Sequence, residues 1–140
     1  MTPDDTALRA ILQDTKVIAL VGWSANPARP SHGVAAYLAR RGYRVIPVNP
    51  GHAGQVTAWG ETVRASLADI TEPVDMVDIF RNSDAVGQVV DEALAALPGL
   101  ATVWMQLGVV NEAAAAKARA AGVAVVMDRC PAIEIPRLIG

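Results

Sequence analysis

The feature of this sequence that most restricts its fold is a repeated alternation between short runs of Val and Ile and longer segments of helical periodicity. Short apolar runs rich in β-branched residues are typical of strands that are buried on both faces of a parallel sheet. The candidate strands are Val17–Val21, Val45–Val48, Val74–Phe80, Thr102–Leu107 and Val123–Met127.

The segments between most of these runs carry apolar residues at helical spacing. Helices are predicted near residues 34–41, 86–97 and 112–121, and each is followed by a glycine or by Pro98-Gly99, which are common helix-ending residues. A further amphipathic helix is expected over residues 4–14. Residues 51–65 are the least regular part, and we expect a loop there, followed by a short helix near residues 66–70.

Strands that alternate with helices predict an α/β fold, because parallel strands need right-handed crossover connections that place helices on both faces. We expect one doubly wound, Rossmann-like domain over residues 1–140, with about five parallel strands in the order 3-2-1-4-5 and the helix of residues 1–14 packed on it. Ligands of such sheets bind where the strand order reverses, which places a crevice at the carboxyl ends of strands 1 and 4.

Composition argues against several classes of partner. The net charge of −2 and the pI of about 5.6 disfavour nucleic acid. No apolar stretch approaches the roughly 20 residues that cross a bilayer, and the acidic N-terminus does not resemble a signal peptide. The single cysteine, Cys130, excludes an internal disulfide framework. A cytoplasmic protein is therefore expected, with no nucleic-acid or membrane partner.

Arginines gather at the predicted carboxyl ends of the strands. Arg29, Arg81 and Arg129 each follow a candidate strand, whereas acids are sparse there, with Asp128 the clear case. Guanidinium groups beside helix N-termini form good sites for phosphate oxygens. The loop after the first strand, V-G-W-S-A-N-P-A-R-P-S, adds Ser24, Asn26 and Ser31 as polar groups, with Ser31 equally suited to capping the next helix.

The residues at the carboxyl ends of the first two predicted strands disfavour a dinucleotide such as NAD, and the chain lacks the loop that binds nucleoside triphosphates. A dinucleotide loop needs G-x-G-x-x-G, but positions 22, 24 and 27 hold Gly, Ser and Pro. The second strand ends in Pro47-Val48-Asn49-Pro50, without the acid that binds the ribose of NAD. A Walker loop is also absent.

No catalytic residue and no metal site is predicted. His32 and His52, the two histidines, are expected to serve as loop or cap residues, and the spacing of His and Cys fits no metal site. Asp75 and Asp78 lie three apart on a strand and so point to opposite faces. For Asp78 we favour edge-strand polarity over a role in orienting the next loop. For Cys130 we favour a structural filler over a thiol that forms a mixed disulfide with a thiol ligand.

At these loops the sequence resembles the small stand-alone CoA-binding proteins, whose Rossmann-type CoA-binding domain is similar to the N-terminal domain of the succinyl-CoA synthetase alpha subunit. The stretches that carry the resemblance span about residues 15–138 in family order. They are V-G-W-S-A-N-P-A-R-P-S, G-Y-R-V-I-P-V-N-P, S-L-A-D-I, V-D-M-V-D-I-F-R, W-M-Q-L-G-V-V-N-E and V-V-M-D-R-C-P. Trp23 and Ala25 depart from the smaller or acidic residues of the family motif, and the phosphohistidine segment of the synthetase is absent.

The resemblance implies coenzyme A as the bound ligand and assigns its contacts. The phosphates would lie among Gly22, Ser24, Asn26, Arg29, Pro30 and Ser31, and Trp23 is a further expected cofactor-binding residue. The adenosine would lie against Val48, Asn49 and Pro50 with Phe80 and Arg81, and the pantetheine arm would pass Gln106 and Gly108.

The function predicted from the sequence is binding of CoA or an acyl-CoA at the carboxyl ends of strands 1, 2 and 4, as a CoA-binding or regulatory protein without catalysis of its own. Two alternatives remain open: a small acyl-CoA- or nucleotide-dependent transferase subunit, and an atypical NAD(P)-binding domain. Association with a second copy of the chain or with a protein partner is left open as well.

Overall fold

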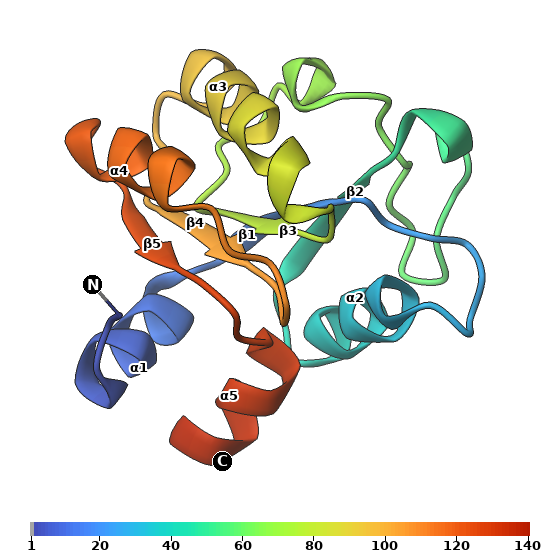
Figure 1. Ribbon diagram of the computed structural model, residues 1–140. Helices are drawn as coiled ribbons and strands as arrows, with labels where there is room; N and C mark the ends of the chain where they lie inside the picture. The colour runs from blue at the N-terminus through green and yellow to red at the C-terminus, as the bar shows by residue number, and fades with distance from the viewer. Residues whose placement is uncertain (1) are drawn as a thin grey trace.

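A five-stranded, all-parallel sheet forms the centre of the molecule, seen in the computed structural model, which describes residues 2–140 (Figure 1). Its strands are β1 (Val17–Val21), β2 (Arg44–Val48), β3 (Met76–Ile79), β4 (Thr102–Met105) and β5 (Ala124–Val126). The helices are α1 (Asp5–Asp14), α2 (Pro30–Arg40), α3 (Val86–Ala96), α4 (Glu112–Ala120) and α5 (Pro131–Leu138). The predicted α/β, Rossmann-like fold is confirmed.

Two local features differ from the prediction. The short helix near residues 66–70 is a single 3₁₀ turn, Leu67–Asp69. Helix α5 was not predicted from the sequence. Pro131 suits the first turn of a helix, but Pro136 lies inside α5, where proline is unusual.

The strand order is β2-β1-β3-β4-β5, so the predicted order 3-2-1-4-5 is wrong. Pro47 gives the physical reason. It has no N–H, so one side of β2 cannot complete a ladder, and proline in a sheet is confined to edge strands. On that outer side the Pro47 carbonyl accepts from the Arg64 N–H at 2.9 Å, while the other side of β2 pairs with β1. Strand β3 therefore pairs with β1 instead of β2, and the order reverses between β1 and β3.

Helices cover both faces of the sheet (Figure 1). Helices α3 and α4 pack on one face against Val21, Val77 and Met105. Helices α1, α2 and α5 pack on the other, against Leu20 and Trp104. The alternation follows from the two-residue period of strands, which sends successive side chains to opposite faces.

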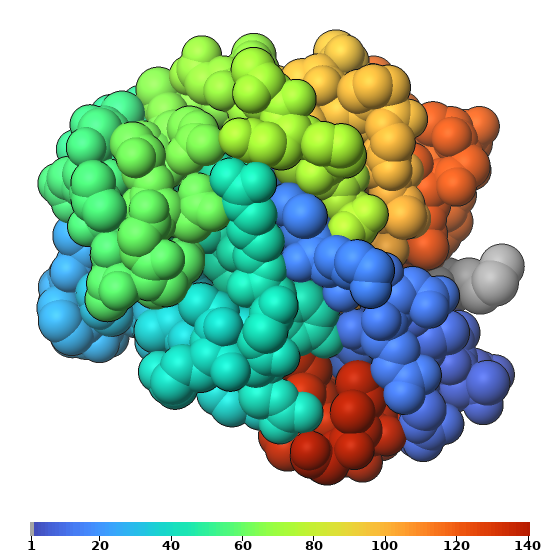
Figure 2. Space-filling model, turned by 180° about the vertical axis from the view of Figure 1, so that it is seen from behind, coloured from blue at the N-terminus to red at the C-terminus, as the bar shows by residue number. Residues whose placement is uncertain are grey.

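The two terminal helices lie side by side, as the view from behind shows (Figure 2). Arg137 of α5 donates to both carboxylate oxygens of Asp5 on α1, at 3.0 and 2.8 Å. Within residues 2–140, no helix has the length and apolar character needed to cross a membrane.

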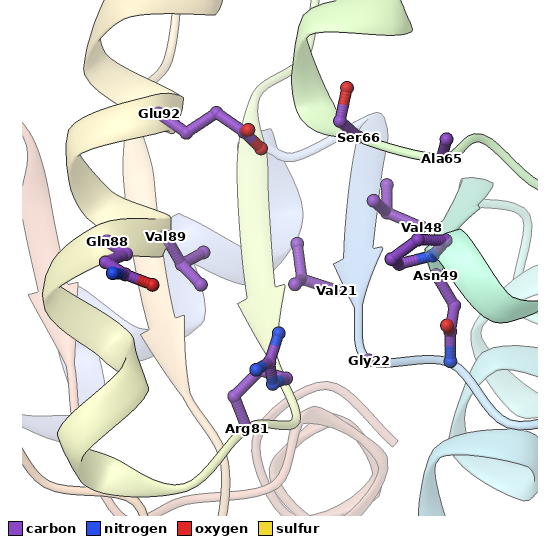
Figure 3. A pocket seen from close by; sticks show the side chains of 11 residues that line it. Val21, Gly22, Val48, Asn49, Ala65, Ser66, Arg81, Gln88, Val89 and Glu92 are labelled. Atoms are coloured by element: carbon purple, nitrogen blue, oxygen red, sulfur yellow. The ribbon is translucent and has the colours of Figure 1, made fainter.

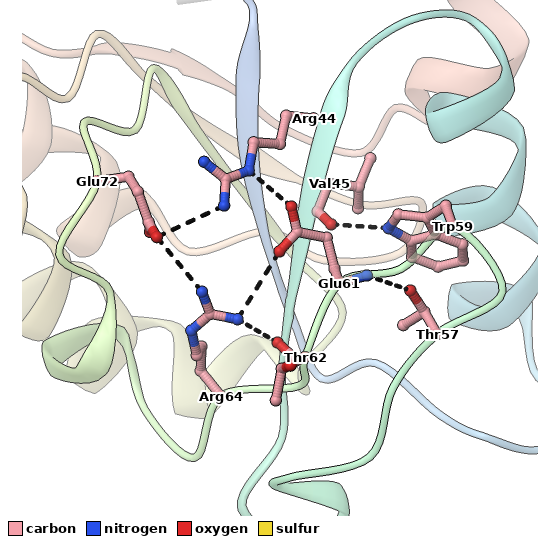
Figure 4. Close-up of polar contacts among 8 residues, drawn as sticks. All are labelled: Arg44, Val45, Thr57, Trp59, Glu61, Thr62, Arg64 and Glu72. Carbon is pink, nitrogen blue, oxygen red and sulfur yellow. Dashed lines mark hydrogen bonds and ion pairs between the residues drawn. The ribbon is translucent and has the colours of Figure 1, made fainter.

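A network of four charged residues fastens the irregular segment between β2 and β3 to the edge of the sheet (Figure 4). Arg44 Nε lies 2.6 Å from Glu61 Oε1, and Arg64 Nη1 lies 3.8 Å from Glu61 Oε2. Both arginines also reach Glu72 Oε1, each at 3.5 Å. The side chains are between 16% and 44% exposed, so the network is partly shielded from water. The segment that it holds pairs with the outer edge of β2: the Trp59 indole N–H donates to the Val45 carbonyl, and the Arg64 N–H donates to the Pro47 carbonyl, both at 2.9 Å.

Candidate functional site

A cleft with two lobes opens at the carboxyl ends of the strands, beside the reversal between β1 and β3. The first lobe, here called the α3-side lobe, has a volume of about 530 Å³ (Figure 3). It is lined by Val21, Gly22, Val48, Asn49, Pro50, Ala65, Ser66, Arg81, Gln88, Val89 and Glu92. The second, the α2-side lobe, has a volume of about 500 Å³. It is lined by Gly22, Ser24, Arg29, Pro30, Ser31, Phe80, Arg81, Asn82, Gln106, Leu107 and Val109.

Gly22 and Arg81 belong to both linings, so the two lobes meet across them. Gly22 has a φ of +90°, and its N–H donates to the Val48 carbonyl at 2.9 Å. A Cβ at this position would lie 2.2 Å from the carbonyl oxygen of Phe80. The glycine is therefore required both by its backbone conformation and by the close approach of β3.

The loop after Gly22 is held by its own polar side chains. The Ser31 hydroxyl accepts from the Ser24 N–H at 3.0 Å, and the Ser24 hydroxyl accepts from the Asn26 N–H at 3.1 Å. Asn26 Oδ1 accepts in turn from the Ala28 N–H at 3.0 Å. Arg29 occupies the N-cap position of α2 without a capping side-chain bond. Ser31 thus ties the loop to the helix instead of capping it. Pro30 has no N–H and the His32 N–H donates to the Arg29 carbonyl at 3.1 Å, so the N-terminus of α2 attracts an anion mainly through the helix dipole.

Two arginines face the cleft without partners. Within residues 2–140, Arg29 and Arg81 make no ion pair or hydrogen bond through their guanidinium groups, although other arginines of the chain do. Figure 3 shows the Arg81 guanidinium directed into the α3-side lobe. Free guanidinium groups beside a helix N-terminus give the cleft a positive potential suited to phosphate.

The third arginine predicted for the cluster lies elsewhere. Arg129 Nη1 lies 3.3 Å from Glu134 Oε1, and its backbone carbonyl accepts from the Trp104 indole N–H at 2.8 Å. Arg129 lines neither lobe. The position after β5 is too far along the sheet from the reversal between β1 and β3, which lies two strands away.

Trp23 is buried beneath the loop and lines neither lobe. Its side chain is 5% exposed, and its ring stacks on His32 at 5.8 Å and meets the edge of His52 at 5.8 Å. The Asn49 amide donates to the Trp23 carbonyl at 2.7 Å. His32 Nδ1 lies 2.9 Å from the Ser24 carbonyl. His32, in the first turn of α2, and His52 therefore both contact the loop after β1, and Trp23 packs against their two rings.

The loop after β4 reaches the α2-side lobe through Gln106, Leu107 and Val109. Gly108 has a φ of +78°, and its N–H donates to Asp128 Oδ1 at 2.7 Å. Gly108 and Asn26, both predicted site residues, do not appear in either lining but lie next to residues that do, and their backbone turns position those neighbours.

Several lining residues were not predicted from the sequence. Ser66 follows the irregular segment, within the S-L-A-D-I stretch that carried the family resemblance. Gln88 and Glu92 are four apart on α3, and that spacing alone places them on one helix face. The Glu92 carboxylate accepts from the Leu67 N–H at 3.0 Å, which joins α3 to the 3₁₀ turn. Gln88 and Glu92 lie on the face of α3 that lines this lobe, and only the packing of α3 in the folded chain reveals that position.

The two acids near β3 lie in unrelated places. The Asp75 carboxylate accepts from the N–H groups of Lys16 and Val17, both at 2.9 Å, at the amino end of the sheet. Asp78 lies in the central strand β3 with no solvent exposure, and neither of its carboxylate oxygens has a partner. Burial raises the pKa of Asp78 well above its usual value. The edge-strand interpretation of Asp78 is therefore wrong, because β3 lies between β1 and β4.

Cys130 is 5% exposed and stands at the N-cap of α5. That buried position favours the structural interpretation of the thiol. Across the residues that the structure describes, no three His, Cys, Asp or Glu side chains converge in a way that could hold a metal ion.

Known proteins match this chain over nearly its whole length. The uncharacterized protein YneT of Bacillus subtilis is 38% identical over 128 residues, which are 91% of each chain. A solved structure from Thermus thermophilus, cell-free ID.343, is 41% identical with a TM-score of 0.90 and covers 98% of this chain and 100% of its own. A hypothetical protein from Pyrococcus horikoshii is 36% identical with a TM-score of 0.90, over 99% of this chain and 94% of its own.

The family model for the CoA binding domain matches residues 16–136, a span that contains all five strands and every residue that lines the two lobes. The chain belongs to the CoA-binding domain family.

Proposed function

We propose that this protein binds coenzyme A or an acyl-CoA in the two-lobed cleft at the carboxyl ends of β1, β2, β3 and β4, as a binding or regulatory protein without catalysis of its own. The observation that carries the proposal is the junction of the lobes at Gly22 and Arg81, with Arg29 and Arg81 free of acidic partners. Adding β3 to the strands predicted from the sequence follows from the corrected strand order.

The shape of the cleft suits a long ligand with chemically different ends. CoA consists of an adenosine with a 3′-phosphate, a diphosphate and an amide-containing arm. The α3-side lobe combines the apolar Val21, Val48 and Val89 with Asn49 and Pro50, a lining suited to an adenosine. The α2-side lobe offers a passage past Phe80 and Gln106 for the arm.

The charge of the cleft suits the phosphates. Arg29 and Arg81 both line the α2-side lobe, and Arg29 is also the N-cap residue of α2, so two guanidinium groups and a helix N-terminus border the same lobe. The end of β2 offers Asn49, whose amide is already engaged with Trp23 and Gly51, and no carboxylate for a ribose diol. This combination favours CoA over NAD.

The position of the titratable side chains supports binding without catalysis. His32, His52, Asp128 and Cys130 are side chains near the strand ends whose chemistry could support proton transfer. None of them lines either lobe within residues 2–140, and the first three are engaged with loop backbone or a loop side chain.

Titration calorimetry of the purified protein with CoA, acetyl-CoA, dephospho-CoA and NAD tests the proposal. We expect CoA and acetyl-CoA to bind at micromolar concentration, dephospho-CoA to bind more weakly because it lacks one phosphate, and NAD to bind weakest. Absence of CoA binding up to about 100 µM, a concentration that still detects a free energy near −5.5 kcal/mol, would contradict the proposal. Preference for NAD would favour the dinucleotide alternative, and turnover of acetyl-CoA would favour a transferase.

A further inference from the structure

Asp78 and Gln106 lie on the same face of neighbouring strands, and Gln106 lines the α2-side lobe. Asp78 is in register with Leu20 on β1 and Trp104 on β4. Gln106 follows two residues after Trp104, and its N–H donates to the Ile79 carbonyl at 3.3 Å, so it continues the ladder of β4 along β3. Residues two apart on a strand share a face, so Gln106 points to the same side as Trp104 and Asp78.

Each of the two side chains has an oxygen that nothing satisfies. Asp78 is fully buried, and both of its carboxylate oxygens lack partners. Gln106 is 5% exposed, and its Oε1 is enclosed without a partner. Its amide nitrogen is not among the enclosed unpartnered atoms, and the side chain lines the α2-side lobe. The Gln106 amide therefore has its oxygen inside the protein and its nitrogen toward the lobe.

A buried carboxyl group of this kind is more stable with its proton than without it. Ionised carboxylates without a partner are strongly disfavoured in an apolar interior, and burial raises the pKa of Asp78. A protonated carboxyl gains an O–H donor, whereas an amide oxygen is an acceptor only. Strands lie about 4.8 Å apart and rise about 3.3 Å per residue, so Asp78 and Gln106, as diagonal neighbours on parallel strands, have backbones roughly 8 Å apart, a gap that an Asp and a Gln side chain can close with one hydrogen bond.

The geometry points to Asp78 as a positioning residue, whose protonated carboxyl donates a hydrogen bond to Gln106 Oε1 and so holds the Gln106 N–H groups toward the α2-side lobe. There the amide donates to a carbonyl oxygen of the ligand. This inference rests on the proposed function, and it restricts the class of ligand to molecules that carry an arm with an amide or acyl carbonyl group. It also explains a buried acid that makes no other contact with a polar group.

No charged group opposes or assists the proton on Asp78. The side chains that pack on this face from α1, α2 and α5 include Leu8, Ala35 and Ile135, all apolar. Among the titratable groups near the same face, the His32 ring contacts the Ser24 carbonyl, Cys130 is a buried free cysteine, and Glu134 pairs with Arg129 and Arg137. Burial is the only cause of the raised pKa of Asp78. Loss of the proton at high pH would remove the donor and release Gln106.

Binding measurements on three variants test this role. Asp78→Asn keeps an N–H donor and cannot ionise. Asp78→Leu keeps the branched shape of the side chain, with larger methyl groups and no donor. Gln106→Leu removes the acceptor. For CoA we expect Asp78→Leu to weaken binding about five- to tenfold, the value of one hydrogen bond, and Asp78→Asn to stay within about twofold of the wild type. In the Gln106→Leu background, Asp78→Leu should have no further effect.

The control ligand is adenosine 3′,5′-bisphosphate, which lacks the arm of CoA. Its affinity should be the same for the wild type and for all three variants. The affinity of the wild type for CoA should also decline toward alkaline pH relative to this ligand, while that of Asp78→Asn should not. Equal effects of Asp78→Leu on both ligands, or equal affinities of the Leu and Asn variants for CoA, would overturn the inference.

A measurement without ligand separates this inference from the proposed function. In ¹⁵N-labelled protein, the side-chain amide resonances of Gln106 should shift strongly in Asp78→Leu and little in Asp78→Asn. Unchanged resonances in Asp78→Leu refute the hydrogen bond, whatever the protein binds. Shifted resonances in a protein that fails to bind CoA would support the hydrogen bond and refute the proposed ligand.

Discussion

Gly22 and Phe80 approach so closely at the ends of β1 and β3 that a Cβ on Gly22 would lie 2.2 Å from the Phe80 carbonyl oxygen. The close approach brings the loop after β1 and the loop after β3 together, and it makes Gly22 and Arg81 the common boundary of the two lobes. The cleft therefore depends on a contact between backbones, which no side-chain rearrangement can replace.

Gly22→Ala should destabilise the fold by about 2–4 kcal/mol, because the substitution combines a strained positive φ with a clash against backbone. Urea unfolding gives the free energy. Gly33→Ala is the matched control: Gly33 lies in α2, a Cβ there meets nothing within 4 Å, and alanine favours helix by about 1 kcal/mol. A Gly22→Ala protein as stable as Gly33→Ala would contradict the described contact.

Arg29→Ala and Arg81→Ala should each weaken CoA binding by about 1.5–3 kcal/mol, the range for a charge-assisted hydrogen bond to phosphate. The free energy of unfolding should change little, because neither guanidinium has a partner within residues 2–140. Arg40→Ala, an exposed position on α2 beside Tyr37, serves as the control for loss of one positive charge. Unchanged affinity in either variant would remove that arginine from the site.

The free energy of unfolding should decrease as the pH rises above 3.8, the usual pKa of an aspartic acid. The pKa of Asp78 is raised in the folded state, so between its usual value of 3.8 and that higher value the folded protein binds a proton that the unfolded chain has lost. The contribution of Asp78 to stability is fully present at a pH below its usual pKa. Between the usual and the raised pKa, the free energy of unfolding decreases by up to about 1.4 kcal/mol per pH unit.

Asp78→Asn should lose this part of the pH dependence, because the amide does not titrate. Unfolding free energies measured by urea at several pH values between 5 and 8 check the prediction. Curves of equal slope for the wild type and Asp78→Asn would mean that Asp78 is not the group responsible.

Glu61→Gln should loosen the segment that forms one wall of the α3-side lobe. Glu61 is 16% exposed and joins Arg44 and Arg64, which also contact Glu72, so removing its charge weakens two ion pairs of a partly shielded network. We expect a loss of about 1 kcal/mol at low salt, reduced in 1 M NaCl, together with faster amide exchange at residues 61–66.

The matched control for Glu61→Gln is Asp91→Asn. Asp91 pairs with Lys117, and the two side chains are 55% and 60% exposed, so the pair is an isolated surface contact. Its loss should change the free energy of unfolding by less than about 0.5 kcal/mol. Equal effects of the two variants would show that the network adds nothing beyond an exposed ion pair.

Periodicity alone was enough to determine the fold class and the positions of most elements. The Val- and Ile-rich runs and the stripes between them are local properties, since burial on both faces requires apolar residues at every position of a strand. For the same reason the loops at the strand ends were recognisable. Arg29, Arg81 and the acid-free end of β2 could be found from them.

Tertiary structure decided what depends on pairing between distant segments. The order of the strands followed from which neighbour each one bonds, and Pro47 made β2 an edge strand with β3 beside β1. That order brought Arg81 to the cleft and left Arg129 with Glu134. It also placed Asp78 at the centre of the sheet, in register with Leu20 and Trp104. The two-residue period of a strand fixes which side chains share a face, but only the packing of the chain decides what that face meets.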